Sequence, residues 1–110
     1  MPTAPRPLNP AEKLDWLRLL RSENVGPVTF YQLLARYGSA AAALEALPEI
    51  ARRGGRDRTL TPFAKGAAER ELAALDRAGA RLVAWGEPGY PAALAAIDDA
   101  PPLLSIRGDP

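Results

Sequence analysis

Residues 24–34 (NVGPVTFYQLL) form the segment of the chain best suited to hold an anion. Gly26 permits a tight turn, and Pro27 suits the first position of a helix. The amide groups that follow, beginning with Val28, would then have no acceptor inside the helix. Such N–H groups can donate hydrogen bonds to a phosphate. The segment therefore predicts phosphate contacts by backbone amides, with Gly26 and Val28 as contact residues.

The layout around this turn is a helix, a short glycine turn and a second helix, as in a helix-hairpin-helix. The usual form has two glycines flanking an apolar residue, whereas Asn24 stands at the first of these positions. Pro27 also removes one donor amide. The alternative interpretation is an ordinary helix connection that packs a small domain, since bare helix termini are far commoner than termini that bind phosphate.

A second group of candidate contacts is the arginine-rich sequence RRGGRDR at residues 52–58. Its two glycines and its lack of an apolar anchor predict an exposed loop. Four arginines of this loop can follow a nucleic-acid backbone and release its counterions: Arg52, Arg53, Arg56 and Arg58. The alternative is a loop that only adds solubility. With 14 basic against 13 acidic residues, the net charge of +1 provides no global attraction to nucleic acid or to an anionic membrane.

The residue types that most active sites need are missing. The chain has no cysteine and no histidine, which excludes disulfides, thiolate zinc sites, cysteine nucleophiles and histidine acid-base pairs. Asp98 and Asp99 are adjacent and precede Ala-Pro-Pro, so we expect them in a turn or cap rather than at a metal. The glycines before Tyr90 lack the spacing of a phosphate-binding loop. We therefore expect no catalytic residue, no metal, no cofactor and no enzymatic activity.

The elements that must position the candidate residues are mainly helical. The chain has 110 residues, 47% of them hydrophobic and 25% charged, which is typical of one globular domain. Apolar periodicity and caps predict helices near residues 10–22, 28–37, 40–47 and 62–78. The expected core residues lie on the apolar faces of these helices: Leu17, Leu20, Phe30, Leu33, Leu34, Leu44, Leu47, Leu72 and Leu75. The first helix has apolar residues on more than one stripe, so we expect neighbours on two of its sides.

Several local signals define where these helices begin and end. Asn9 and Glu12 have the spacing of a capping box, and Gly38 with Ser39 predicts a stop followed at once by a new start. Pro48 is expected to open a short turn after the third helix, and Thr61 with Pro62 to begin the fourth. Glu69 and Glu71 flank Arg70, which predicts a solvated helix face with local ion pairs.

After residue 79 the pattern changes to short strands. We expect strands at residues 81–85 and 103–107, joined by a connection with a short helix near 91–97. Strand, helix, strand favours a parallel pair with a crossover. Because two lone strands make a poor sheet, the chain is expected to be truncated within an α/β domain. The expected division is a flexible tail at 1–8, a helical domain at 9–79 and the first strands of a further domain at 80–110.

A membrane span needs about 20 consecutive apolar residues, and no apolar run in the chain is that long. No signal peptide begins the chain, so a cytoplasmic protein is expected.

The order of these segments resembles the N-terminal part of the bacterial DNA-processing protein A family (DprA, also called Smf). The segments are VGPVTFYQLLARYGS, ALEALPEIARRGG and GARLVAWGEPGYPAALAAIDDAPPLLSIRGD. The most specific residues match that family's entry to its Rossmann-like domain: Tyr90-Pro91, Leu94, Ile97, Asp99, Pro102-Leu103-Leu104 and Gly108-Asp109. The resemblance implies a sterile-alpha-motif-like or helix-hairpin-helix-like bundle, followed by two strands that begin a Rossmann-like domain.

The resemblance also implies a function. Members of this family bind and shield incoming single-stranded DNA during natural transformation and help to load the recombinase RecA onto it. Their main pocket begins with a Val-Gly-Ser-Arg-type segment downstream of the Gly-Asp pair, so none of its residues can be placed on this sequence. The helical module would be accessory, in a full-length protein that forms a homodimer and binds no membrane. The alternative is a protein interaction module of sterile-alpha-motif type, with Tyr31, Tyr37 and exposed leucines as its patch.

Overall fold

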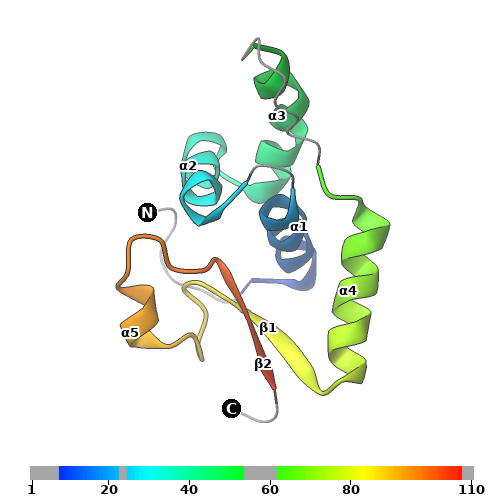
Figure 1. Cartoon of the computed structure of the whole chain (residues 1–110), viewed down its shortest axis with the longest axis vertical. Helices are drawn as coiled ribbons and strands as arrows, with labels where there is room; N and C mark the ends of the chain where they lie inside the picture. The colour runs from blue at the N-terminus through cyan, green and yellow to red at the C-terminus, as the bar shows by residue number, and fades with distance from the viewer. Residues whose placement is uncertain (1–7, 23–24, 54–61, 108–110) are drawn as a thin grey trace.

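The computed structural model describes residues 8–22, 25–53 and 62–107. Four helices are followed by a two-stranded sheet whose connection contains one further helical turn (Figure 1). The elements are α1 (Pro10–Arg21), α2 (Pro27–Tyr37), α3 (Ala40–Arg53), α4 (Lys65–Arg77), β1 (Ala80–Ala84), α5 (Ala92–Ala95) and β2 (Leu103–Arg107). The mainly helical class predicted from the sequence is confirmed.

Caps define the start of α1, the end of α2 and the start of α3, as predicted. The Asn9 side chain accepts a hydrogen bond from the Glu12 amide at 2.8 Å, and the Asn9 amide donates to the Glu12 carboxylate at 3.1 Å. Gly38 ends α2 in the left-handed region, with φ of 86°. The Ser39 hydroxyl then accepts from the Ala42 amide at 3.1 Å and starts α3.

The prediction that the third helix ends at residue 47 is wrong. α3 continues through Pro48 to Arg53. A proline inside a helix removes one backbone hydrogen bond and costs about 3 kcal/mol. Pro48 is exposed, while Leu47 is fully buried and Ile50 packs against the core. Burial of this apolar face favours the continued helix, because packing contributes more to helix stability than propensity does.

The predicted start of the fourth helix at residue 62 is also wrong, since α4 begins at Lys65. Bonds to α1 engage both backbone groups of Phe63: its amide donates to the Ser22 hydroxyl at 3.1 Å, and its carbonyl accepts from Arg18 Nε at 2.9 Å. The Phe63 carbonyl is used by Arg18, and the helical ladder begins one residue later, where the Ala64 carbonyl accepts from the Ala68 amide at 3.1 Å. Thr61, the predicted cap, lies outside the described residues.

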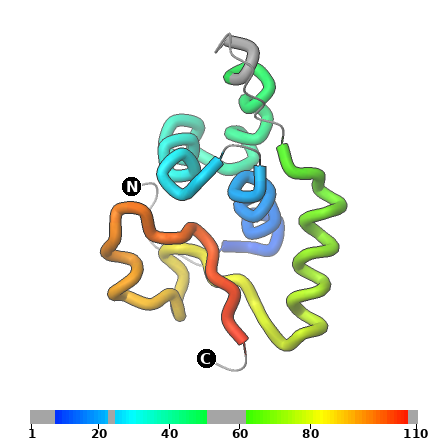
Figure 2. The backbone as a smooth tube through the Cα atoms, viewed as in Figure 1, coloured from blue at the N-terminus to red at the C-terminus, as the bar shows by residue number. Residues whose placement is uncertain are grey.

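α1 is the central element of the helical part, packing against α2, α3 and α4 (Figure 2). The apolar stripes of this helix predicted neighbours on two of its sides, and the structure confirms them. Six of the nine predicted core residues are buried, namely Leu17, Phe30, Leu33, Leu34, Leu44 and Leu47, and the other three, Leu20, Leu72 and Leu75, are partly buried against the same cluster. Leu19 and Trp16 on α1 belong to the buried cluster as well.

The two strands pair in antiparallel fashion, which corrects the predicted parallel crossover. Val83 lies opposite Leu104, and Ala80 lies opposite Arg107. The connection folds back on itself at one end of the sheet: the Trp85 indole donates to the Ala95 carbonyl at 3.3 Å, and the Tyr90 hydroxyl to the Pro101 carbonyl at 2.6 Å. A parallel return would require the connection to run the length of the sheet, and its four-residue helix α5 does not do so.

Within the part of the chain that the structure describes, no helix combines the length and the apolar character needed to cross a membrane.

Candidate nucleic-acid interface

The N-terminus of α2 presents two amide groups to the outside. Gly26 is its N-cap, in extended backbone with φ of −104° and ψ of −174°, and no side chain caps the helix. The Gly26 carbonyl accepts from the Phe30 amide at 2.8 Å, so the helical ladder begins there. Pro27 has no N–H. The amides of Val28 and Thr29 therefore find no acceptor among the described residues.

Among the described residues, the surroundings of these two amides are open. Gly26 and Pro27 are exposed, and Val28 is 53% exposed. A Cβ atom built on Gly26 would meet no atom within 4 Å, and the first turn of α2 has no acidic residue. Because the helix dipole places partial positive charge at this end, the site favours an anion. The structure thus exposes Gly26 and Val28 at a helix N-terminus with unpaired donors.

The structure places two of the four predicted arginines. Arg52 and Arg53 are the last two residues of α3 rather than part of a loop. This differs from the sequence-based expectation because the helix continues beyond Pro48. Arg56 and Arg58 lie outside the described residues.

The comparison with known families concerns these same helices. A family model described as "DprA-like N-terminal HHH domain" matches residues 10–74, more than half of the chain. The chain belongs to this family. No curated protein matches the chain. The matched residues include α1, the turn at Gly26, α2 and α3, and most of α4.

Two other arginines of this DprA-like chain, Arg21 and Arg36, have internal partners. Arg21 on α1 pairs with Glu71 on α4, with Nη2 and Oε2 3.0 Å apart. The sequence predicted a solvated face with local ion pairs for Glu69 and Glu71, whereas Glu71 pairs with a different helix because α1 packs beside α4 and brings Arg21 within reach. Arg36 lies over the ring of Tyr37, 5.4 Å from its centroid.

Glu87 is a buried partner that the sequence analysis missed. Its carboxylate accepts hydrogen bonds from the Leu8 amide at 2.9 Å and from the Ala84 amide at 2.7 Å, and it pairs with Lys13 Nζ at 3.0 Å. Lys13 also donates to the Leu82 carbonyl at 3.0 Å. Burial alone would raise the pKa of Glu87, but the two amides and the Lys13 ammonium outweigh it and hold the pKa below its usual value.

No local signal could have identified Glu87, because its partners Leu8 and Lys13 lie more than seventy positions earlier in the chain. Leu8 is the last residue of the predicted flexible tail, yet it is bonded to Glu87 just after β1 and packs against the core cluster. Residues 1–7 of that tail lie outside the described residues.

Tyr31 has an internal role rather than the exposed one that the interaction-module alternative gave it. Its hydroxyl donates to the Ala100 carbonyl at 2.9 Å, and its ring packs edge-on against Phe30 and Trp85 with centroids 5.6 and 6.3 Å apart. Burial, with a smaller contribution from Tyr90, raises the pKa of Tyr31 and keeps the hydroxyl protonated.

Among the described residues the exposed large hydrophobic side chains are Val28 and Ile97, so the predicted patch of tyrosines and leucines is wrong.

Proposed function

We propose that this DprA-like chain binds single-stranded DNA through phosphate contacts, as the accessory helical part of a DNA-processing protein. The observation that carries the proposal is the uncapped N-terminus of α2, inside the segment matched by the DprA-like family model. There the amides of Val28 and Thr29 have no acceptor among the described residues. Arg52, Arg53, Arg56 and Arg58 supply further positive charge from the sequence. Neither amides nor such arginines read base edges, so binding has no sequence preference.

The wider role follows from the family resemblance and is part of the proposal. The full-length protein would shield incoming single-stranded DNA in the cytoplasm, help to load RecA and act as a homodimer. Its main DNA pocket would lie in a Rossmann-like domain that begins with β1 and β2. The outer edge of β2 supports a larger sheet, because the backbone groups of Leu103, Ser105 and Arg107 point away from β1 and have no partner among the described residues.

The direct test is a salt titration of oligonucleotide binding. The 110-residue chain should bind a fluorescent single-stranded oligonucleotide with a Kd no tighter than about 10⁻⁴ to 10⁻⁶ M, the range of non-specific phosphate contact. The logarithm of the affinity should fall linearly with the logarithm of salt. Changing Arg52, Arg53, Arg56 and Arg58 to alanine should weaken binding equally for all sequences. It should flatten the slope by up to about 0.7 for each arginine that contacts a phosphate.

A matched control removes the same charge elsewhere. Lys65, Arg70, Arg77 and Arg107 are all exposed on α4 and β2, so their quadruple alanine variant has the same net charge. It should bind more tightly, and with a steeper salt slope, than the Arg52–Arg58 variant. If both variants behave alike, net charge alone explains the binding. If neither changes it, the arginine segment contacts no DNA and the alternative, a protein interaction module, gains support.

A further inference from the structure

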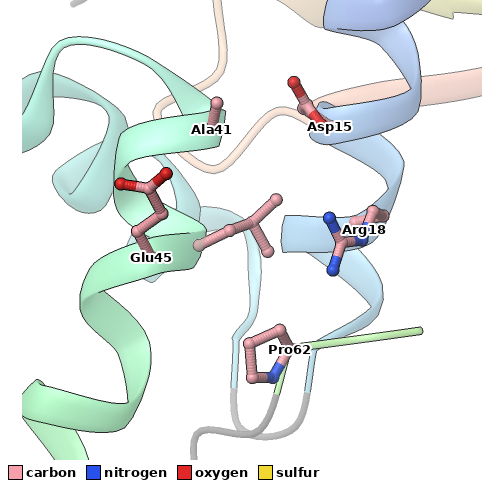
Figure 3. Close-up of a pocket in the computed structure, with 6 residues that line it drawn as sticks. Asp15, Arg18, Ala41, Glu45 and Pro62 are labelled. Atoms are coloured by element: carbon pink, nitrogen blue, oxygen red, sulfur yellow. The ribbon is translucent and has the colours of Figure 1, made fainter. Parts of the chain in front are cut away.

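A pocket between α1, α3 and the segment before α4 is chemically unlike the N-terminus of α2. It has a volume of about 220 Å³ and is lined by Asp15, Arg18, Ala41, Leu44, Glu45 and Pro62. Figure 3 shows the α1 residues on one side, the α3 residues on the other and Pro62 at one end. Three segments that are distant in sequence thus form one concave site.

The charged groups of this pocket are largely unsatisfied within the described chain. Neither the Asp15 nor the Glu45 carboxylate has an ion-pair or hydrogen-bond partner there. Arg18 uses Nε to hold the Phe63 carbonyl at 2.9 Å, which orients its guanidinium and leaves Nη1 and Nη2 for another acceptor. Two carboxylates and one guanidinium give the pocket one net negative charge.

Charge and size together restrict the occupant. A phosphate backbone would be repelled by the two carboxylates. The volume of about 220 Å³ is below the roughly 300 to 1,000 Å³ of sites that hold drug-sized ligands and is sufficient for a single long side chain. Ala41, Leu44 and Pro62 provide apolar contact for an aliphatic stem, as long basic side chains require.

We propose that this pocket receives an arginine side chain of a protein partner. The partner's guanidinium donates to Asp15 and Glu45, and its five N–H groups suit two separate carboxylates better than a compact ammonium does. Its stem packs on Leu44 and Pro62. The free Nη groups of Arg18 donate to a backbone carbonyl of the same partner segment. The pocket is therefore a protein-binding surface, distinct in charge from the proposed DNA contact.

The test uses Nα-acetyl-arginine amide as a probe, because it has both a guanidinium and backbone carbonyls. In an NMR titration of the ¹⁵N-labelled 110-residue chain, the amides of Asp15, Ala41, Leu44 and Glu45 should shift in a saturable manner. Nα-acetyl-citrulline amide, which has the same shape without the charge, should bind at least several-fold more weakly. Equal binding of the two probes, or shifts confined to other residues, would overturn the proposal.

Charge-neutralising variants locate the site. The double variant Asp15→Asn/Glu45→Gln should weaken the arginine probe about three- to tenfold, as expected for two solvent-accessible ion pairs of up to about 1 kcal/mol each. The matched control Glu69→Gln/Asp76→Asn removes two exposed carboxylates of α4 and should leave the affinity unchanged. Equal effects of both double variants would mean that only net charge matters, and the proposal would be wrong.

The thermal stability of the same variants distinguishes a partner site from a role within the fold. Because Asp15 and Glu45 have no partner in the described chain, Asp15→Asn/Glu45→Gln should keep its Tm within about 2 °C of the control variant. A clear loss of stability would show that the carboxylates serve the fold and would overturn the proposal. All these measurements omit nucleic acid, so they are independent of the DNA-binding result.

Discussion

At the scale of single residues, Gly26 matters for what it leaves uncovered. Its φ of −104° is accessible to any residue, and a Cβ atom there would meet nothing within 4 Å, so neither strain nor crowding requires a glycine. Aspartate or asparagine at an N-cap would accept hydrogen bonds from the amides that follow. With glycine at this position, the amides of Val28 and Thr29 remain available to an external anion.

Gly26→Asp should therefore separate stability from binding. The new carboxylate caps α2 and favours the helix dipole, so the free energy of unfolding should rise by about 0.5 kcal/mol. The same carboxylate occupies the amides and repels phosphate, so the affinity for single-stranded oligonucleotides should fall several-fold. Gly26→Asn, which caps without charge, should show a smaller loss. Fluorescence anisotropy and thermal melts measure both effects, and unchanged affinity in both variants would contradict contact at these amides.

Glu87 shows how one carboxylate can connect three segments. It bonds to Leu8 before α1, to Lys13 on α1 and to Ala84 on β1, and its side chain is only 9% exposed. Removing the charge leaves the Lys13 ammonium and two amides with a weaker acceptor. Unsatisfied buried polar groups typically cost about 1 to 3 kcal/mol.

The pH dependence of stability should identify this carboxylate. Because the pKa of Glu87 is lowered in the folded state, ionised Glu87 stabilises the protein above its ordinary pKa of 4.5, and this contribution is lost as pH falls through the folded pKa. Glu87→Gln should lower the free energy of unfolding by about 1 kcal/mol at neutral pH. Its deficit relative to the original chain should shrink on acidification from pH 6 to about pH 3, as measured by urea unfolding. A constant deficit, or the same behaviour in Glu69→Gln, would disprove the assignment.

At the scale of secondary structure, the decisive element is α3. Its second half follows Pro48, an exposed residue that cannot donate to the Leu44 carbonyl. The helix persists because its apolar face packs on α1 and α2, with Leu47 buried before Pro48 and Ile50 packed against the core after it. The continuation also carries Arg52 and Arg53 at the end of a helix instead of in a loop.

Pro48→Ala tests this continuation. The substitution restores the missing amide in a helix interior, so the free energy of unfolding should rise by about 1 to 3 kcal/mol, and far-UV circular dichroism should show no loss of helix. Ala35→Pro is the matched opposite, since Ala35 is an exposed interior residue of α2, and it should destabilise by about 3 kcal/mol or more. If Pro48→Ala changes neither stability nor helix content, α3 does not extend past residue 48.

At the scale of the whole molecule, the helical part and the strand pair share one core. Leu82 and Ala84 of β1 and Leu103 of β2 belong to the same buried cluster as the helices. The aromatic rings of Trp16, Phe30, Tyr31 and Trp85 form a chain from α1 to the end of β1, with successive centroids 5.0, 5.6 and 6.3 Å apart. The strands are therefore attached to the helices by packing as well as by sequence.

Shared packing predicts a single cooperative unfolding transition. The indole N–H signals of Trp16 and Trp85 report separately on the helices and on the strand pair, and their NMR melting midpoints should coincide with that of far-UV circular dichroism. Tyr31→Phe removes the bond to the Ala100 carbonyl and should lower both midpoints together. Earlier loss of the Trp85 signal alone would show that the strand pair unfolds independently.

The helix boundaries that the sequence predicts well are those with short-range causes. The capping box of Asn9 and Glu12 and the glycine stop at Gly38 depend on residues within a few positions, so composition and spacing suffice to place them. The apolar periodicity of α1 and α2 likewise predicts their buried faces. The exposed, uncapped start of α2 at Gly26 follows from the same local signals.

Tertiary structure alone decided the features that depend on distant partners. Leu8 and Glu87 are 79 positions apart, and Lys13 and Leu82 are 69 apart, so no local pattern shows that they meet. The same holds for the delayed start of α4, the helix beyond Pro48 and the antiparallel return of β2, where long-range packing or hydrogen bonds prevail over local propensity. Asp15 and Glu45 belong to different helices, and only the packing of α1 against α3 brings them to one pocket. Local propensities are worth tenths of a kcal/mol per residue, whereas buried contacts are worth several times more, so the fold resolves such conflicts in favour of packing.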